Sequence, residues 1–185
     1  MRVDRIRFVG KVATHDEAVT AIQQRSGDAV LVVRGVVRSL ILNCPCGCGH
    51  HLTINLDFRV GPAWRIYLRK NALTLFPSYW RDSQCQSHFI LWGNRIYWCD
   101  HDDWMGNEVS AGLRQVVLET LPSEFVRYET VAETIGEIPW DVLDACRALA
   151  REGKVEQHPD KRRRGEFRRI NTSSHKVGVV QQSLT

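Results

Sequence analysis

The sequence lacks the long apolar run that a transmembrane helix needs. No stretch of its 185 residues approaches the ~20 consecutive apolar residues that cross a bilayer. The first ten residues, MRVDRIRFVG, are charged throughout and contain no apolar signal-peptide core. We therefore expect a cytoplasmic protein without membrane contact. In such a reducing compartment, clustered thiols are more often metal ligands or catalytic groups than disulfides.

Several motifs that identify common enzyme classes are also missing. The chain has no G-x-S-x-G nucleophile motif, no P-loop and no H-E-x-x-H zinc-protease motif, and it shows no internal repeat. The C-x-x-C spacing of dithiol oxidoreductases is absent as well. The composition, with 43% hydrophobic and 25% charged residues, is that of an ordinary globular protein. Any chemistry must therefore come from residues in a less familiar arrangement.

Three of the six cysteines alternate in the segment NCPCGCGHH, residues 43–51. Proline and glycine between these thiols permit a tight turn. Further along the chain, a cysteine and a histidine have C-x-x-H spacing. Zinc takes four thiolate or imidazole ligands, which usually come as two local groups. We therefore predict a zinc site built from five candidate donors: Cys44, Cys46, Cys48, Cys85 and His88.

Other interpretations of these thiols remain open in the sequence. They can be buried side chains without a metal, or a redox pair, although three alternate cysteines among glycines pack poorly as core. An iron–sulfur cluster is less favoured than zinc, because it would be expected to use cysteines alone. Five donors for four places leave a surplus. Either the site is open, with three ligands and a water of lowered pKa, or a spare thiol acts structurally or as a nucleophile.

The segment 85–104 predicts a β-hairpin that brings a histidine and a cysteine together. Gly93-Asn94, between two aromatic and β-branched runs, is a hairpin turn signal. With this two-residue loop, His88 pairs with Cys99 on one face. Cys99 is therefore a candidate nucleophile or a replacement zinc ligand, and Ser78 and His88 are further weak catalytic candidates. His50, His51 and His101 are expected to be solvated, and Cys146 to lie in the core.

The remaining pattern predicts an α+β protein. Before the cysteines we expect a strand at 6–9, a helix capped by Thr14, and an apolar run broken at Gly35. After them, residues 51–58 alternate, which predicts that Leu52, Ile54, Leu56 and Phe58 share one buried face. Helices are predicted at 108–121, at 130–136 with Thr130 as its cap, and from Pro139 to just before Gly153. The chain then continues into a strand, a basic turn and a second strand.

These elements define three predicted regions. Residues 1–107 form a mainly antiparallel β zinc-binding core, residues 108–172 a winged helix-turn-helix-like domain, and residues 173–185 a disordered tail. The net charge of +4 comes from the C-terminal part, since residues 151–185 sum to +5. Arg162, Arg163 and Arg164 on the predicted wing are candidates for DNA contact. A solvated hairpin and a protein-docking module are the alternatives, because the third helix carries two Asp and one Glu against two Arg.

The motifs around the cysteines resemble those of a bacterial domain family. The resemblance covers roughly residues 28–100 and does not include the basic C-terminus. It consists of six motifs: CPCGCG at 44–49, LTINL at 52–56, PAW at 62–64, LFPSYW at 75–80, CQSHF at 85–89 and GNRIYWC at 93–99. Members of that family tend to be encoded beside bacterial ubiquitin-like proteins and their activating (E1-like) and conjugating (E2-like) enzymes, in operons linked to phage defence.

The resemblance implies a zinc-binding partner of such a pathway, and a peptidase that processes or removes the ubiquitin-like modifier. It carries over to Cys44, Cys46, Cys48, Ser78, Cys85, Ser87, His88 and Cys99. Whether a zinc-bound water, a cysteine or a serine attacks the substrate stays open. The alternatives are a non-catalytic adaptor that zinc stabilises and a DNA-binding regulator that uses the basic wing.

Overall fold

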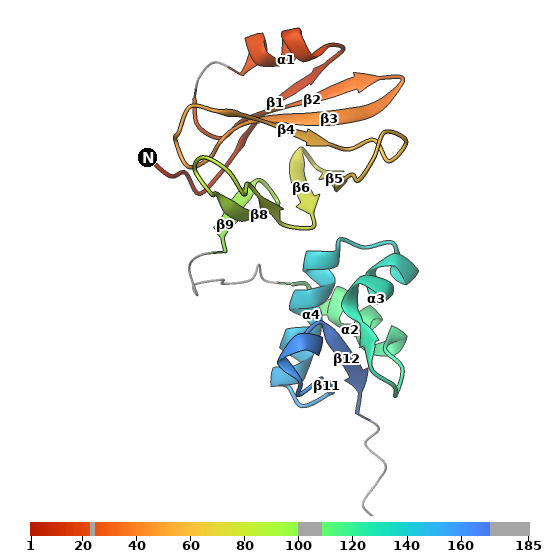
Figure 1. Cartoon of the computed structure of the whole chain (residues 1–185). Helices are drawn as coiled ribbons and strands as arrows, with labels where there is room; N and C mark the ends of the chain where they lie inside the picture. Colours follow the sequence, from red (N-terminus) through yellow and green to blue (C-terminus); the bar gives the residue numbers. More distant parts are fainter. Residues whose placement is uncertain (23–24, 100–108, 171–185) are drawn as a thin grey trace, which may run out of the picture. The chain divides into compact units, whose positions relative to one another are not determined.

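A computed structural model of the chain describes residues 1–22, 25–99 and 109–170 (Figure 1). The chain divides into two compact units, Met1–Gly106 and Asn107–Thr185. The described residues form four α-helices and mostly antiparallel sheets, so the predicted α+β class is confirmed. None of the helices in this part of the chain is long and apolar enough to span a membrane. The predicted tail at 173–185 and His101 lie outside the described residues.

A four-stranded sheet in the order β1-β2-β3-β4 is the centre of the first unit. Its strands are β1 (Arg7–Val12), β2 (Asp28–Arg34), β3 (Val36–Asn43) and β4 (His51–Asn55). β1 and β2 are parallel and are connected through α1 (His15–Ala21), whereas the other pairs are antiparallel. Thr14 caps α1 as predicted, because its hydroxyl accepts the backbone N–H of Glu17. The predicted break at Gly35 separates β2 from β3, with φ of +73°.

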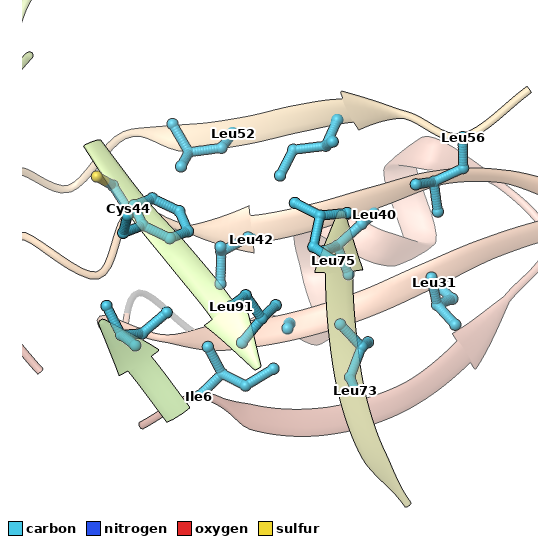
Figure 2. Close-up of a cluster of buried hydrophobic side chains, with 14 residues drawn as sticks. Ile6, Leu31, Leu40, Leu42, Cys44, Leu52, Leu56, Leu73, Leu75 and Leu91 are labelled. Atoms are coloured by element: carbon cyan, nitrogen blue, oxygen red, sulfur yellow. The ribbon is translucent and has the colours of Figure 1, made fainter. Parts of the chain in front are cut away.

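Both faces of this sheet are covered. On one face, Ala18 and Ile22 pack against Val30, Val32 and Ile41. On the other face, leucines of the sheet meet leucines of β6 and β8, as Figure 2 shows: Leu31, Leu40, Leu42, Leu52, Leu73, Leu75 and Leu91. Successive strand residues point to opposite faces. The first five residues of β2 are therefore all buried, which explains why the part of this strand after Asp28 is a continuous apolar run, AVLVV.

Two small sheets form the layer over that second face. β5 (Arg65–Arg69) pairs with β6 (Ala72–Phe76), and β7 (Tyr79–Trp80), β8 (His88–Trp92) and β9 (Arg95–Trp98) form a three-stranded sheet in that order. The Gly93-Asn94 turn has φ of +57° and +66°, as a two-residue hairpin requires. The predicted register is confirmed, because Trp92 pairs with Arg95 and the Cys99 N–H donates to the His88 carbonyl at 3.0 Å.

Two predictions about element boundaries are wrong. β4 ends at Asn55, and the Asn55 side chain accepts the backbone N–H of Asp57 at 3.0 Å, which turns the chain. Phe58 therefore leaves the buried face and is 64% exposed. In the second unit, the predicted helix at 130–136 begins earlier, at Tyr128 with Arg127 as its cap residue. Thr130 lies inside that helix.

In the second unit, the described residues 109–170 form three α-helices and a small antiparallel sheet in the order β10-β12-β11. Cys146 is fully buried on α4, which confirms its predicted place in the core. The elements in chain order are α2 (Ala111–Thr120), β10 (Val126–Arg127), α3 (Tyr128–Ile135), α4 (Pro139–Arg151), β11 (Val155–Gln157), η1 (Lys161–Arg163, a 3-10 turn) and β12 (Glu166–Arg169).

Candidate functional site

The alternating cysteines occupy a tight loop between β3 and β4. The Cys44 N–H donates to the His50 carbonyl at 2.9 Å, and the Gly47 N–H donates to the Cys44 carbonyl at 3.1 Å. Gly47 and Gly49 have φ of +85° and +78°, a conformation that side chains disfavour. A Cβ at Gly47 would also collide with the backbone of Met1, so the loop requires glycine there. This conformation lets all three thiols of the loop point to one place.

Four sulfur atoms gather at this loop. The Sγ atoms of Cys44, Cys46, Cys48 and Cys85 all lie within 4.8 Å of one another. Cys44 Sγ is 3.3 Å from Cys46 Sγ and 3.8 Å from Cys85 Sγ. Thiolates on a tetrahedral zinc, with Zn–S of about 2.3 Å, lie roughly 3.8 Å apart. The four thiols therefore fit a metal ion of this size. His88, the fifth predicted donor, lies outside the group.

A buried serine holds two of these sulfurs. Ser87 is 2% exposed, and its Oγ lies 3.2 Å from Cys85 Sγ and 3.5 Å from Cys44 Sγ. Burial raises the pKa of the Cys85 thiol, but hydrogen bonds from the hydroxyl and backbone N–H of Ser87, together with those from Cys46 and Cys48, outweigh burial and lower that pKa to about 6. Burial raises the pKa of Cys44. Although burial opposes it, hydrogen bonds from Ser87 and from neighbouring thiols also lower the pKa of Cys46. A cluster in which two thiols deprotonate readily and a third is buried suits a soft cation, which binds as protons leave.

His88 meets a serine instead of the cysteines. Its Nε2 lies 3.2 Å from Ser78 Oγ. Ser78 follows the cis Phe76–Pro77 bond and precedes β7, and His88 is the first residue of β8. Trp80 pairs directly with His88 across the two strands. Because side chains alternate along a strand, this register places Ser78, Trp80 and His88 on one face and sends Tyr79 and Phe89 to the other.

Aromatic rings fix the backbone on both sides of this pair. The Trp64 indole N–H donates to the Ser78 carbonyl at 3.3 Å, and its ring lies 5.6 Å from that of Tyr79. Trp80 is 65% exposed and its ring is 6.1 Å from the His88 imidazole. Tyr79 and Phe89 pack into the core cluster of the unit. Ser78 and His88 are both half-buried. Their side chains are thus held by rigid neighbours while they remain accessible to a substrate.

The structure divides the five predicted metal donors into two places: the four cysteines lie together, and His88 contacts Ser78. Three of the predicted donors come from one loop and the fourth, Cys85, lies three residues before His88. Cys99 is exposed, pairs with His88 in the backbone register, and is not part of the four-thiol group. The Ser78–His88 contact was not predicted. The motifs LFPSYW and CQSHF contain both residues, but nothing local in either motif indicates that they meet.

The basic residues of the second unit lie on its surface. Arg162 and Arg163 belong to η1 and Arg164 follows it, and all three are exposed. The Arg163 guanidinium pairs with Glu166 at 2.6 Å, so part of its charge is neutralised. Glu156 likewise pairs with Arg168 at 2.6 Å. Of the three arginines, Arg163 is thus the one whose charge a described carboxylate partly neutralises.

The first unit thus presents a serine–histidine pair fixed beside a four-thiol cluster. Residues 16–99 match the model of a family described as "bacterial ubiquitination-like system serine protease (BubE)". The match covers somewhat less than half of the chain, and it contains the four clustered cysteines, Ser78 and His88. The chain is therefore similar to a protease family of a bacterial ubiquitination-like system. No curated protein and no solved structure matched the chain.

Proposed function

We propose that the first unit is a serine peptidase of a bacterial ubiquitin-like pathway, with Ser78 as nucleophile and His88 as general base. The observation that carries this proposal is the 3.2 Å contact between Ser78 Oγ and His88 Nε2. A serine is activated when a base lies within hydrogen-bond reach of its hydroxyl. The similarity to a family described as a serine protease supports the same assignment. The substrate class is the ubiquitin-like protein of such a pathway, as a precursor or as a conjugate.

The reaction follows from this pair. Ser78 Oγ attacks the carbonyl carbon of the scissile bond while its proton passes to His88 Nε2. The tetrahedral intermediate collapses, the C–N bond breaks, and the imidazolium gives its proton to the leaving amine. A water molecule then attacks the acyl ester with the same histidine as base, and Ser78 is released. One peptide bond and one water are consumed, and no other reactant is needed.

The four thiols support the reaction without taking part in it. We assign zinc to Cys44, Cys46, Cys48 and Cys85, where it would supply a structural cross-link between the β3–β4 loop and the segment before β8. Ser87 contacts two of these sulfurs and is the residue next to His88. Four thiols within reach favour a closed site over one that holds a reactive water. Attack by a zinc-bound water is therefore less well supported than attack by Ser78.

A substrate-independent test is available. A fluorophosphonate probe reacts with a serine that a neighbouring base activates. We expect the full chain to be labelled at Ser78, with the modified peptide identified by mass spectrometry, and labelling to fall in a His88→Ala variant. Ser83, an exposed serine five residues from His88, provides the control and should stay unmodified. Absence of labelling at Ser78 in a folded, metal-loaded protein would favour a non-catalytic adaptor instead.

A second candidate function belongs to the second unit. We propose that it is a winged-helix module whose η1 turn contacts DNA. The observation that favours it is the order of its elements, with helices α2 to α4 ahead of a β11–β12 hairpin that carries Arg162 and Arg164 exposed at its turn. Such guanidinium groups contact phosphates with little sequence preference. Asp141 and Asp144 on α4 oppose deep insertion of that helix into a groove.

Mobility shifts test this second function. We expect the full chain to retard a short DNA duplex at about 50 mM salt, with binding that weakens steeply as salt rises. Arg162→Ser with Arg164→Ser should abolish the shift. Lys11→Ser with Arg34→Ser removes the same charge from exposed positions of the first unit and should preserve it. If both double variants bind alike, or if no shift forms at low salt, the η1 turn is not a DNA contact.

A further inference from the structure

β7 is an edge strand beside the serine–histidine pair. Its sheet has the order β7-β8-β9, so among the described residues β7 has a strand partner on one side alone. The strand consists of Tyr79 and Trp80 and begins directly after Ser78. The outer side of an edge strand carries backbone N–H and C=O groups with which another extended chain can pair. This edge therefore brings possible pairing groups next to the proposed nucleophile.

The hydrogen bonds of β8 show which residue of β7 faces outward. The Cys99 N–H donates to the His88 carbonyl at 3.0 Å, so the backbone polar groups of His88 point toward β9. The Arg81 N–H donates to the Ser87 carbonyl at 2.9 Å, so those of Arg81 point toward β8. Trp80 pairs with His88 and precedes Arg81. Because the direction alternates along an antiparallel pair, the N–H and C=O of Trp80 point away from β8.

These two outward-facing groups are available for pairing. In the part of the chain that the structure describes, no residue hydrogen-bonds to the Trp80 backbone from the outer side. The preceding outward-facing carbonyl, that of Ser78, is already used, because it accepts the Trp64 indole N–H at 3.3 Å. Pairing along this edge can therefore begin at Trp80, which offers one donor and one acceptor to the same partner residue.

The side chain of Trp80 adds an apolar contact at the same position. It is 65% exposed and lies on the face of Ser78 and His88, with its ring 6.1 Å from the imidazole. In a strand added to this edge, the residue opposite Trp80 would have its Cβ roughly 5 Å from the Trp80 Cβ on that face. An apolar side chain there would bury part of the indole. One partner residue would thus contact both the backbone and the side chain of Trp80.

The shortness of the edge favours a peptide over a second copy of the chain. β7 has two residues, and Pro77 before Ser78 has no N–H to donate. Two such edges would form few hydrogen bonds with each other, whereas an extended peptide can continue past the edge toward the nucleophile. Strand residues rise about 3.3 Å each, so a peptide paired with Trp80 carries a bond two residues further along to a point beside Ser78.

We propose that the outer edge of β7 binds the peptide substrate as an added strand, in which a residue with an apolar side chain pairs with Trp80, two residues from the cleaved bond. The Trp80 N–H donates to the carbonyl of that residue, and the Trp80 carbonyl accepts its N–H. The role in cleavage rests on the proposed peptidase function, whereas binding of an extended segment does not. A residue inside a helix has already used its backbone groups, so the site selects flexible segments.

Hydrogen exchange of individual amides, followed by NMR, tests this pairing without turnover. The protein is the full chain with Ser78→Ala, and the probe is a head-to-tail fusion of two copies of a ubiquitin-like protein from a bacterial ubiquitination-like system. We expect saturation with the fusion to slow exchange of the Trp80 amide by about tenfold or more. The control is the Thr53 amide on the exposed edge strand β4, which should be unchanged. It also points outward, because the Leu56 N–H, three residues on, donates inward to the Arg38 carbonyl.

Variants separate the Trp80 contact from a general loss of apolar surface. Trp80→Ala should weaken binding of the fluorescein-labelled fusion, measured by anisotropy, by about tenfold or more, and Trp80→Phe should restore most of it. Val36→Ala alters another exposed apolar residue of the first unit, 42% exposed at the start of β3, and should leave binding unchanged. Thermal unfolding confirms that each variant is folded.

Several results would overturn the proposal. They are a Trp80 amide that exchanges equally with and without the fusion, equal affinity of Trp80→Ala and Val36→Ala, and no saturable binding. Protection of the Trp80 amide in the free chain that grows with protein concentration would assign the edge to a second copy and overturn it as well. Fluorophosphonate labelling is read separately in the unaltered chain. Labelling of Ser78 without protection at Trp80 removes the docking edge alone, and protection without labelling removes the peptidase function alone.

Discussion

Replacing Ser78 with alanine is expected to reduce cleavage by at least about 10³-fold, because loss of the nucleophile of a serine hydrolase leaves only binding and oxyanion stabilisation. The substrate is a head-to-tail fusion of two copies of a ubiquitin-like protein from a bacterial ubiquitination-like system. Cleavage is followed by mass spectrometry of the products under conditions where enzyme limits the rate. Ser83→Ala is the matched control and should retain the activity of the unaltered chain, since Ser83 lies exposed in the loop before Cys85.

His88→Ala should lower the same rate by a similar factor, and the double variant should be no slower than either single one. Groups that act as one catalytic unit show such non-additive losses. Full activity of Ser78→Ala would remove the serine mechanism. A rate that then falls in Cys99→Ala would transfer the role of nucleophile to Cys99.

Local signals in the sequence are sufficient for several elements. The Gly93-Asn94 hairpin was predictable with its register, because the turn needs two residues with positive φ and these two accept it. The break at Gly35 follows from the same physics. The four-thiol group was largely predictable too, since three of its members lie within five residues and only one distant partner had to be found.

Tertiary contacts determine the features that local sequence signals did not predict. Phe58 continues an alternating pattern and was assigned to the buried face, but the Asn55–Asp57 hydrogen bond ends the strand first. His88 follows Cys85 at a spacing that zinc ligands use. However, the pairing of β7 with β8 places the His88 imidazole against Ser78. That pairing depends on how Tyr79 and Phe89 pack against the core, and no spacing within either motif encodes it. Trp64 belongs to the PAW motif, but the motif predicts no role for it, because its partner is a backbone carbonyl fourteen positions away.

The segment Cys85–His88 connects the two parts of the site. Cys85 belongs to the thiol group, Ser87 bonds to its sulfur, and His88 begins the strand that faces Ser78. The Arg81 N–H donates to the Ser87 carbonyl at 2.9 Å, which keeps this segment beside β7. Because side chains of adjacent residues share one backbone, movement of Cys85 also moves the imidazole of His88. In the proposed peptidase, the thiol group would therefore position His88, the proposed base.

If the proposed zinc site and peptidase are both correct, removal of the metal should unfold this region of the first unit and abolish the peptidase activity together. We expect the purified chain to hold about one zinc per chain, as measured by mass spectrometry of the metal, because four thiols form a closed site. Structural zinc contributes about 10–16 kcal/mol of apparent binding free energy in small domains. Without it, buried Cys44 and its neighbours lose their cross-link, and the two loops that they join are no longer held together.

Hydrogen exchange resolves where that loss occurs. After treatment with a chelator, or in Cys85→Ser, backbone amides of β8 and of the Cys44–Cys48 loop should exchange much faster, whereas amides of α4 in the second unit should be unchanged. Cys99→Ser is the matched control, since Cys99 pairs with His88 but lies outside the thiol group, and it should keep both the zinc and the protection of β8. A chain that is purified without metal and retains protected β8 amides would show that the thiols pack as ordinary core residues. If chelation exposes β8 while Ser78 still reacts with the fluorophosphonate, the base is positioned by its strand partners alone.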